Sequence, residues 1–241
     1  MPAPVTLPRL SWGDVDRPAV LLAHGLGSDG ALMWRFGTAL ADAGWHAVAV
    51  DLRGHGDAPR TLDYTLAAYG ADLAATRPDR GGAWDAVVGH SLGGAAATLA
   101  AAGDPAWTRR LVLIDPAILL ADHDRETVRA SQEQSFAEHP HWHPIDVELK
   151  ARATQRASRW AVEQTSLQNP TWDVRPAAAA LSVPTHVIGA DPAVYSIFTG
   201  ALADEVRRNP VVSMSIVSGA GHSPHRDRPD ETVAALRAAL G

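Results

Sequence analysis

The fold is decided by the stretch Gly89-His90-Ser91-Leu92-Gly93-Gly94, which follows the apolar run 86–88 and precedes an alanine-rich segment. This is a Gly-x-Ser-x-Gly pattern between a predicted strand and a predicted helix. A sharp strand-to-helix turn lifts the serine hydroxyl out of the sheet, and the flanking glycines leave room in the crowded turn. The next backbone N–H lies at a helix start, where it can stabilise a developing negative charge.

The composition is that of an ordinary globular protein, with 241 residues, 46% of them hydrophobic and 20% charged. The net charge of −6 and the lack of a Lys/Arg block disfavour nucleic acid and anionic membranes as partners. With no cysteine, neither a disulfide nor a cysteine nucleophile is available. The first residues lack a signal-peptide pattern, and no apolar run approaches the roughly 20 residues of a membrane span. We therefore expect a cytoplasmic monomer or homodimer with a small-molecule partner.

Six short apolar runs each end in a loop signal, as expected for strands buried on both faces of a parallel sheet. They are residues 19–23, 47–50, 86–88, 111–114, 186–188 and 212–217. The last run alternates between apolar and polar residues, which predicts a strand nearer the sheet edge. One further short strand is expected around residues 9–12.

Segments of helical length separate these runs, and the alternation predicts an α/β fold with a mainly parallel central sheet flanked by helices. The predicted helices are residues 31–43, 62–75, 92–102, 199–208 and a C-terminal one that begins near Pro229. Residues 118–180 contain no convincing strand but hold helix-like stretches at 125–138 and 146–166. We interpret 118–180 as a helical lid inserted into a core made of residues 1–117 and 181–241.

The lid carries three tryptophans, Trp142, Trp160 and Trp172, which either form local core or line an apolar pocket. It also carries the histidine-rich stretch 139–144. Two prolines break any helix there and no cysteine is present, so a solvated polar loop is favoured over a metal site.

Polar residues follow the carboxyl ends of the predicted strands, which is the edge where ligands bind to parallel α/β sheets. They include His24, Asp51, Ser91, Asp115, Asp191 and His222. Their expected convergence on one rim is the main argument for an enzyme.

Ser91 is the candidate nucleophile, although a serine that only caps the following helix is the simpler alternative. His222, in the tight loop Gly219-Ala220-Gly221-His222, is the candidate base, because a pKa near neutrality lets imidazole accept and return a proton. His225 competes with it for this role.

The third group is a carboxylate that holds the imidazole in one tautomer and stabilises its charged form. Asp191 and Asp115 both qualify, since each begins an Asp-Pro pair after a predicted strand and lies between Ser91 and His222 in the chain. We favour Asp191 and keep Asp115 as the alternative; Asp-Pro is also a common turn starter.

An oxyanion hole needs two preorganised N–H donors. Leu92, directly after the serine, supplies one, and Leu26 in the loop 24–27 is the candidate for the other. The alternative for that loop is a plain glycine-rich turn. The stretch 51–56 is interpreted as structural, with a charged pair that braces the rim.

The ordered set of motifs at 24–27, 51–56 and 89–93, with Asp191 and His222, resembles lid-bearing members of the α/β-hydrolase superfamily. The resemblance spans nearly the whole chain and is specific for the fold, not the substrate. It implies a triad of Ser91, His222 and a carboxylate, oxyanion donors at Leu26 and Leu92, and no cofactor.

Haloalkane dehalogenases and epoxide hydrolases of this superfamily carry an aspartate at the position of Ser91, so they are disfavoured. Residues 190–199 and 219–222 are similar to those of small hydrolases that include fungal lactonases. Members of that subgroup can place a glutamate acid just after the fourth apolar run, where this chain has Ile114 followed by Asp115.

We expect a serine hydrolase that cleaves a carboxylic ester or lactone through an acyl-enzyme intermediate. The same layout also serves C–C bond hydrolysis, acyl transfer and perhydrolysis. A further alternative is a small-ligand-binding protein without turnover, which would have no need of an intact serine, histidine and acid.

Overall fold

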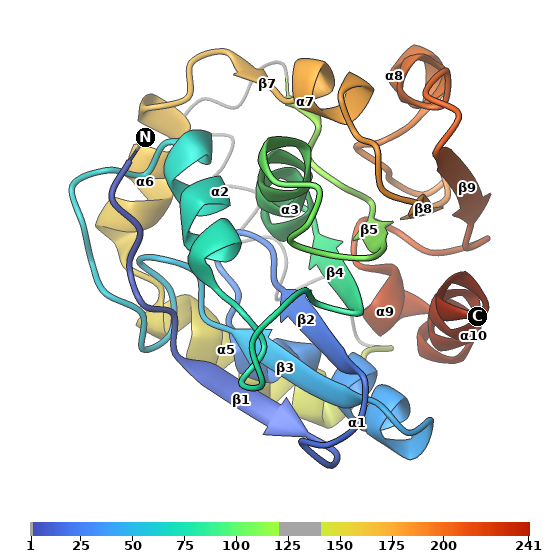
Figure 1. Cartoon of the computed structure of the whole chain (residues 1–241), viewed down its shortest axis with the longest axis horizontal. Helices are drawn as coiled ribbons and strands as arrows, with labels where there is room; N and C mark the ends of the chain where they lie inside the picture. Colours follow the sequence, from blue (N-terminus) through green and yellow to red (C-terminus); the bar gives the residue numbers. More distant parts are fainter. Residues whose placement is uncertain (1, 121–140) are drawn as a thin grey trace.

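The computed structural model describes residues 2–120 and 141–241. A seven-stranded sheet with the order β1-β3-β2-β4-β5-β8-β9 lies at its centre (Figure 1). All neighbouring strands are parallel except β1, which pairs antiparallel with β3. The strands are β1 (Arg9–Trp12), β2 (Ala19–Ala23), β3 (His46–Val50), β4 (Ala86–His90), β5 (Leu111–Ile114), β8 (Thr185–Gly189) and β9 (Val212–Ile216).

Helices cover both faces of this sheet (Figure 1). Around the sheet lie η1 (Gly30–Met33), α1 (Trp34–Asp42), α2 (Leu66–Ala75), α3 (Leu92–Gly103), α7 (Arg175–Ala179), α8 (Gly200–Val206), α9 (Pro224–Asp227) and α10 (Pro229–Leu240). The predicted α/β architecture, the first strand and the edge position of the last strand are confirmed.

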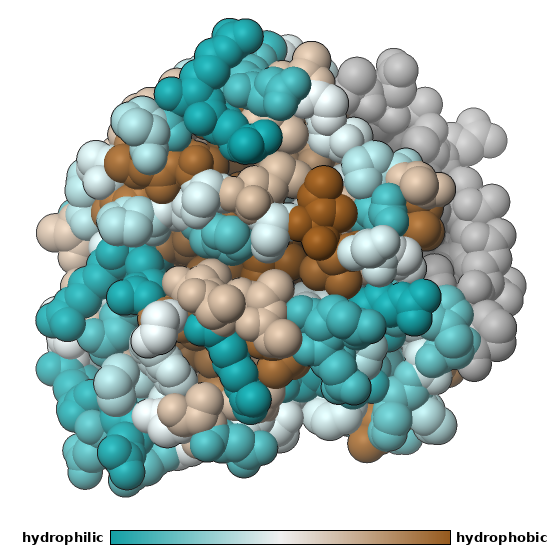
Figure 2. All heavy atoms as spheres, turned by 90° about the vertical axis from the view of Figure 1, so that its right-hand side faces the viewer, coloured by the Kyte–Doolittle hydropathy of each residue, from teal (hydrophilic) through white to brown (hydrophobic). Residues whose placement is uncertain are grey.

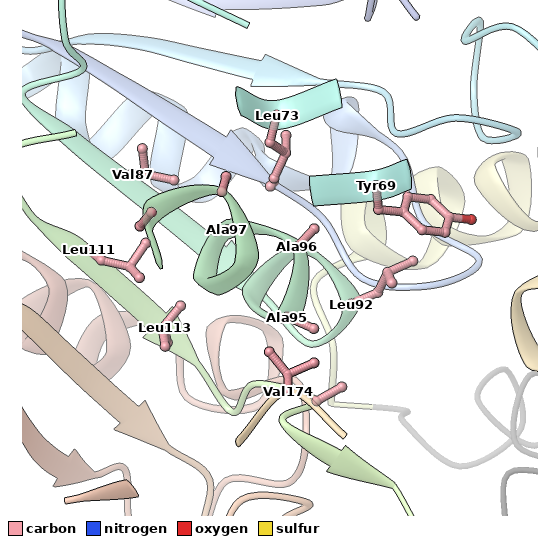
Figure 3. Packing of buried hydrophobic residues seen from close by; sticks show 14 of the residues in the cluster. Tyr69, Leu73, Val87, Leu92, Ala95, Ala96, Ala97, Leu111, Leu113 and Val174 are labelled. Carbon is pink, nitrogen blue, oxygen red and sulfur yellow. The ribbon is translucent and has the colours of Figure 1, made fainter. Parts of the chain in front are cut away.

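The strands bury side chains on both faces, which explains their continuous apolar runs. In β2, Leu21 belongs to the core cluster beneath α2 and α3, whereas Val20 and Leu22 belong to the cluster beneath α1 and α10. Alanines of α3 pack against β4 and β5 in the first cluster (Figure 3). Their small side chains let α3 lie close to the sheet, and this fixes the position of its first residue, Leu92.

The segment between β5 and β8, residues 118–180, is called here the inserted segment. Its described part holds β6 (Leu119–Leu120), α5 (Pro144–Arg156), α6 (Arg159–Leu167), β7 (Trp172–Asp173) and α7. The expectation of no strand in this segment is wrong, because β6 and β7 pair antiparallel in a small sheet of their own. The predicted helix at 125–138 lies outside the described residues, and the role of the segment as a lid stays a prediction.

The predicted helix at 146–166 is instead two helices. Ala157 leaves the helical conformation with ψ 128°, and the Ser158 side chain accepts a hydrogen bond from Ala161 N and so starts a second helix. Among the described residues, no helix is long and apolar enough to cross a membrane.

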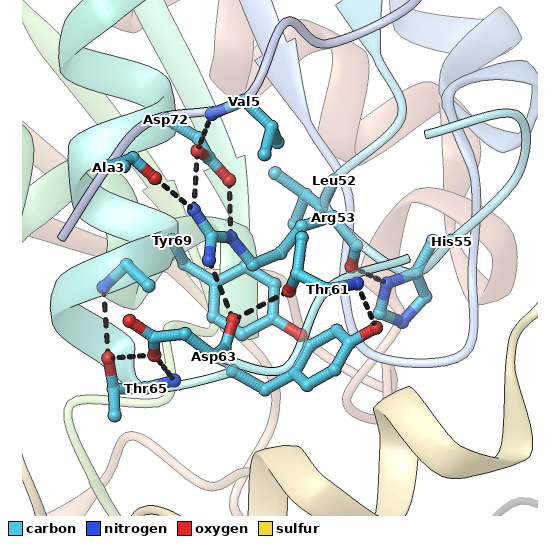
Figure 4. Close-up of polar contacts among 12 residues, drawn as sticks. Ala3, Val5, Leu52, Arg53, His55, Thr61, Asp63, Thr65, Tyr69 and Asp72 are labelled. Atoms are coloured by element: carbon cyan, nitrogen blue, oxygen red, sulfur yellow. Dashed lines mark hydrogen bonds and ion pairs between the residues drawn. The ribbon is translucent and has the colours of Figure 1, made fainter. Parts of the chain in front are cut away.

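The stretch 51–56 is held by a buried ion pair (Figure 4). Arg53 Nε donates to one carboxylate oxygen of Asp72 on α2, and a terminal guanidinium nitrogen donates to the other, both at 2.6 Å. A further guanidinium nitrogen donates to Asp63 O at 2.6 Å, and Val5 N donates to Asp72 at 2.7 Å. The pair therefore ties the loop after β3 to α2 and to the N-terminal segment, in agreement with the predicted bracing role.

We expect Arg53→Met to lower the free energy of unfolding by about 3–5 kcal/mol, because it leaves the Asp72 carboxylate buried without its partner. Urea unfolding followed by circular dichroism measures this. Arg77→Met is the matched control, since the pair between Arg77 and Asp104 is about 40% exposed. An equal loss in both variants would contradict the structural role assigned to the buried pair.

Candidate active site

Ser91 lies in a strained turn between β4 and α3. Its backbone has φ 51° and ψ −116°, a conformation that residues with a side chain rarely adopt. Ser91 N donates to Ile114 O, and Ser91 O accepts from Ala117 N, so β5 and the loop after it hold the turn in place. The hydroxyl consequently projects beyond the end of the sheet instead of capping α3, with which its side chain forms no capping hydrogen bond.

The glycines of the Gly-x-Ser-x-Gly pattern are required by close backbone contacts. A Cβ on Gly89 would lie 2.6 Å from Gly93 O, and a Cβ on Gly93 would lie 2.4 Å from Ala23 O. Both distances are far inside van der Waals contact with backbone atoms that cannot move aside. These two contacts explain why the turn needs glycine at both positions, as the sequence predicts.

The structure brings Ser91, His222 and Asp115 together. His222 Nε2 lies 3.0 Å from Ser91 Oγ, and His222 Nδ1 lies 2.7 Å from Asp115 Oδ2. A carboxylate only accepts, so Nδ1–H donates to it and Nε2 is left free to accept the serine proton. The His222 side chain is about a quarter exposed to solvent, whereas the Asp115 side chain is fully buried.

Asp115 is held as a carboxylate by a dense set of donors. Its Oδ1 accepts from Ser196 Oγ at 2.6 Å, and its Oδ2 accepts from Ile197 N at 3.1 Å. Burial alone would raise the pKa of Asp115, but the hydrogen bonds from His222, Ser196 and Ile197 outweigh it and lower the pKa below its ordinary value. Ser196 and Ile197 were not identified from the sequence, which offers no signal for them.

The preference for Asp191 as the third group does not agree with this geometry. Asp191 accepts from Gly219 N at 2.7 Å and from Ala193 N at 2.9 Å, and it forms no hydrogen bond or ion pair with His222. These hydrogen bonds lower its pKa and fasten the loop that carries His222. The hydrogen bonds of each carboxylate supply the reason, because Asp191 is bound by the backbone of Ala193 and Gly219, whereas Asp115 Oδ2 faces His222 Nδ1.

The loop after β2 lies against Ser91, where a second oxyanion donor is expected. A Cβ on Gly25 would lie 3.2 Å from Ser91 Cβ. Leu92 is the first residue of α3, and the first N–H groups of a helix have no partner within it. Leu26, the next residue after Gly25, is partly buried against the core. Leu26 and Leu92 thus flank the serine, and their service as oxyanion donors stays a prediction.

Two buried histidines hold the loop 24–27 in position. His24 Nε2 accepts from Leu52 N at 3.0 Å, and His55 Nε2 accepts from Gly27 N at 3.1 Å. Burial lowers the pKa of His24 to about 4 and that of His55 to about 3. Both rings are therefore neutral near pH 7, as their acceptor roles require. Their place beside glycines in two loops of the rim is the signal that could have identified them.

The other histidines near the site serve different purposes. His90 lies 4.9 Å from His222 between ring centroids, and its Nε2 donates to the His222 backbone carbonyl at 2.8 Å. His225, the competing base, is buried against Phe36 and His90, and neither of its ring nitrogens has a hydrogen-bond partner among the described residues. Burial lowers the pKa of both His90 and His225 well below the ordinary value.

The tryptophans of the inserted segment divide between core and surface. Trp172 donates to Ala117 O at 2.6 Å and Trp142 donates to Asp227 Oδ1 at 2.6 Å, whereas Trp160 is 53% exposed. In the histidine-rich stretch, His141 lies 3.3 Å from Asp227, and His143 accepts from Ile145 N at the start of α5. Among the described residues, no group of three or more potential ligands is placed to hold a metal ion.

Hydrophobic side chains lie in the middle of the face that Figure 2 shows, with hydrophilic residues around them. Val194 and Tyr195, both more than half exposed, lie next to the His222 loop. Val194 Cγ1 would be 3.6 Å from a Cβ on Gly221, and the Tyr195 ring centroid lies 6.1 Å from that of His222. An apolar part of a ligand can therefore rest beside the histidine.

A sequence model described as the Alpha/beta hydrolase family matches residues 20–236. Taken with the seven-stranded sheet and the serine, histidine and aspartate at its carboxyl edge, this match shows that the chain belongs to the α/β-hydrolase family.

Several characterised proteins are similar to this chain. Lipase LipV of Mycobacterium tuberculosis is 33% identical over 150 residues, which cover 62% of this chain and 54% of the lipase. The sn-1-specific diacylglycerol lipase ABHD11 of Mus musculus is 35% identical over 43% of this chain, so the chain spans only 34% of that protein. The 2-succinyl-6-hydroxy-2,4-cyclohexadiene-1-carboxylate synthase of Serratia proteamaculans is 27% identical over 95% of both chains.

Solved structures share the same architecture. An E-2-(acetamidomethylene)succinate hydrolase has a TM-score of 0.82 at 23% identity and covers 98% of this chain and 95% of its own. Est816, described as an N-acyl homoserine lactone degrading enzyme, has a TM-score of 0.77 at 18% identity over 97% of this chain and 96% of its own. At these identities the likeness extends to the fold alone.

We expect Asp115→Asn to lower kcat for an ester substrate by about 10⁴-fold, because an amide neither fixes the His222 tautomer nor stabilises the imidazolium. Asp191→Asn, in the neighbouring loop, is the matched control and should cost less than about tenfold. Steady-state rates on one ester, with circular dichroism to check folding, distinguish the two carboxylates. A larger loss in Asp191→Asn would reinstate that residue as the acid.

The free energy of unfolding should fall as the pH is lowered from about 6.5 towards 4. The unfolded chain binds protons at His24 and His55 in this range, whereas the folded chain, with both pKa values depressed, does not. His55→Gln should make the slope shallower by up to about 1.4 kcal/mol per pH unit, the value for one proton. Denaturation across this range tests it, with the exposed His143→Gln as comparison; identical slopes in all three proteins would contradict the assignment.

Proposed function

We propose that this protein is a serine hydrolase that cleaves a carboxylic ester or lactone through an acyl-enzyme intermediate. Ser91 is the nucleophile, His222 the base, Asp115 the carboxylate that orients it, and the Leu26 and Leu92 N–H groups bind the oxyanion. The observation that carries the proposal is the continuous hydrogen-bond relay from Ser91 Oγ through His222 to the buried Asp115.

The reaction proceeds in two halves. His222 Nε2 takes the proton of Ser91 as the oxygen attacks the substrate carbonyl, and Asp115 stabilises the imidazolium that forms. The two backbone N–H groups bind the negative oxygen of the tetrahedral intermediate. His222 then protonates the leaving alcohol, activates a water molecule against the acyl-enzyme and returns its proton to Ser91 Oγ.

The surroundings support this assignment of roles. The strained Ser91 backbone and the neutral His24 and His55 keep the nucleophile and the oxyanion loop fixed before substrate binds. Preorganised donors are effective because they need no rearrangement when charge develops. Lipase LipV, the 33% identical relative, agrees with an ester bond as the target.

A second candidate is a reaction other than ester hydrolysis with the same residues. One specific observation favours it, because the relative that matches 95% of this chain is named as a 2-succinyl-6-hydroxy-2,4-cyclohexadiene-1-carboxylate synthase. C–C bond cleavage, acyl transfer and perhydrolysis all remain compatible with the relay. Product analysis by mass spectrometry, with and without a second nucleophile, distinguishes them from hydrolysis of an ester.

Ser91→Ala should reduce turnover of a short-chain nitrophenyl ester by at least about 10³-fold, because the proposed acyl-enzyme forms on this hydroxyl. Release of nitrophenolate by the purified wild type and the variant measures this. Ser223→Ala, in the loop just after His222, controls for loss of a nearby hydroxyl. Equal rates in wild type and Ser91→Ala would mean that the esterase activity does not depend on this site.

A further inference from the structure

Two buried cations lie between the inserted segment and the core, and the relay does not use either of them. Lys150 belongs to α5 and Arg226 to α9, and their residues are 6% and 5% exposed. Long cationic side chains are seldom buried to this extent unless they are paired. Each of them therefore calls for a partner.

Arg226 has no anionic partner of its own. Its guanidinium carbon lies 5.1 Å from the ring centroid of Trp142, and its buried Nε has no hydrogen-bond partner within residues 2–120 and 141–241. In the described part of the chain, no carboxylate oxygen lies within 4.0 Å of a guanidinium nitrogen of Arg226, so the side chain forms no ion pair there. A contact through the flat face leaves the N–H groups at the edge available for a planar acceptor.

Two of the acidic residues whose charge acts on Arg226 are engaged elsewhere. Asp146 accepts from Trp34 Nε1 and from Arg35 Nε, both at 2.8 Å. Asp227 accepts from Trp142 Nε1 and, at 2.8 Å, from Gly221 N. These two carboxylates and that of Asp29, whose buried Oδ2 has no hydrogen-bond partner among the described residues, attract Arg226 from a distance, but burial still lowers its pKa to about 10.

Lys150 reaches the oxyanion loop directly. Its Nζ donates to Gly27 O at 2.8 Å, one residue beyond Leu26. Burial and the positive charge of Arg226 together lower the pKa of Lys150 to about 7, against the opposing attraction of Asp29. The two cations are thus close enough to repel each other, and an anion between them would relieve that repulsion.

Both cations flank the reaction centre. Arg226 follows His222 by four residues, in the short helix α9 at the end of the histidine loop. Lys150 contacts the loop whose Gly25 lies against Ser91. The positive charges of both residues also act on His24 and His90.

We propose that Arg226, assisted by Lys150, binds a carboxylate group on the substrate, so that the ester or lactone cleaved by this enzyme is anionic. This proposal rests on the proposed function and adds the substrate class to it. A carboxylate matches the planar edge of a guanidinium and accepts two parallel N–H bonds.

The test compares mono-nitrophenyl esters of dicarboxylic acids, from glutaric to suberic acid, with neutral nitrophenyl esters of the same chain length. The series is needed because the span from Ser91 to Arg226 selects one length. We expect the wild type to prefer the charged ester at one length at least, and Arg226→Met to reduce the ratio of kcat/KM values by about ten- to a hundredfold, mainly through KM. No preference at any length, or an unchanged ratio in the variant, would overturn the proposal.

Three further variants test whether the preference for the charged ester depends on Arg226 and Lys150. Arg226→Lys keeps the charge but loses the planar fork, so its ratio should fall between those of wild type and Arg226→Met. Lys150→Met should lower the ratio as well. Arg109→Met removes an arginine whose side chain is 73% exposed and should leave the ratio unchanged. A fall of the ratio in Arg109→Met equal to that in Arg226→Met would overturn the assignment to this site.

Calorimetric titration of the free dicarboxylates separates this proposal from the proposed function, because binding needs no turnover. Wild type should bind the preferred dicarboxylate and not the diol of the same length, even if Ser91 proved inactive. If Arg226→Met does not fold, this comparison on the wild type still tests whether the protein binds a carboxylate. Equal binding of dicarboxylate and diol, or of neither, would overturn the carboxylate subsite while leaving the serine hydrolase untouched.

Discussion

The structure depends on one close backbone contact, where Gly93 at the start of α3 meets the end of β2. Gly93 N donates to His24 O at 3.1 Å, and no side chain fits between them. This contact holds Ser91 in its strained conformation and aligns the start of α3 with the loop 24–27. The nucleophile, the expected oxyanion donors and the sheet edge therefore form one rigid unit, which the hydrophobic packing of α3 on the sheet keeps in place.

Stability and function draw on the same buried polar groups in this protein. The pair between Arg53 and Asp72 fixes the loop that carries His55, and His55 in turn fixes Gly27 in the oxyanion loop. Neutral histidines are suited to this task, because one ring nitrogen accepts from a backbone N–H while the other donates to a carbonyl. The cost is sensitivity to acid, since the folded state excludes protons that the unfolded chain binds.

Much of the fold could be predicted from the sequence, since strands buried on both faces leave continuous apolar runs and Gly-x-Ser-x-Gly reports a local backbone requirement. The choice between Asp115 and Asp191 could not be predicted. Both start an Asp-Pro pair after a strand, and only the packing of the loops in space, with the Ser196 hydroxyl bound to Asp115 from a distant loop, decides which one contacts His222. The break at Ala157 was missed although Ser158 is a good helix-capping residue, because the apolar pattern continues across it. That Arg226 lies buried without an ion-pair partner among the described residues likewise depends on segments distant in the sequence, so it could not be predicted either.

The most direct test of the central claim, that the relay activates Ser91, is covalent labelling with a fluorophosphonate probe followed by peptide mass spectrometry. The relay predicts one adduct per chain on the peptide that contains Ser91, formed rapidly in wild type and much more slowly in Asp115→Asn and His222→Gln. No adduct in the folded wild type, or labelling of Ser91 at the same rate in all three proteins, would contradict the account.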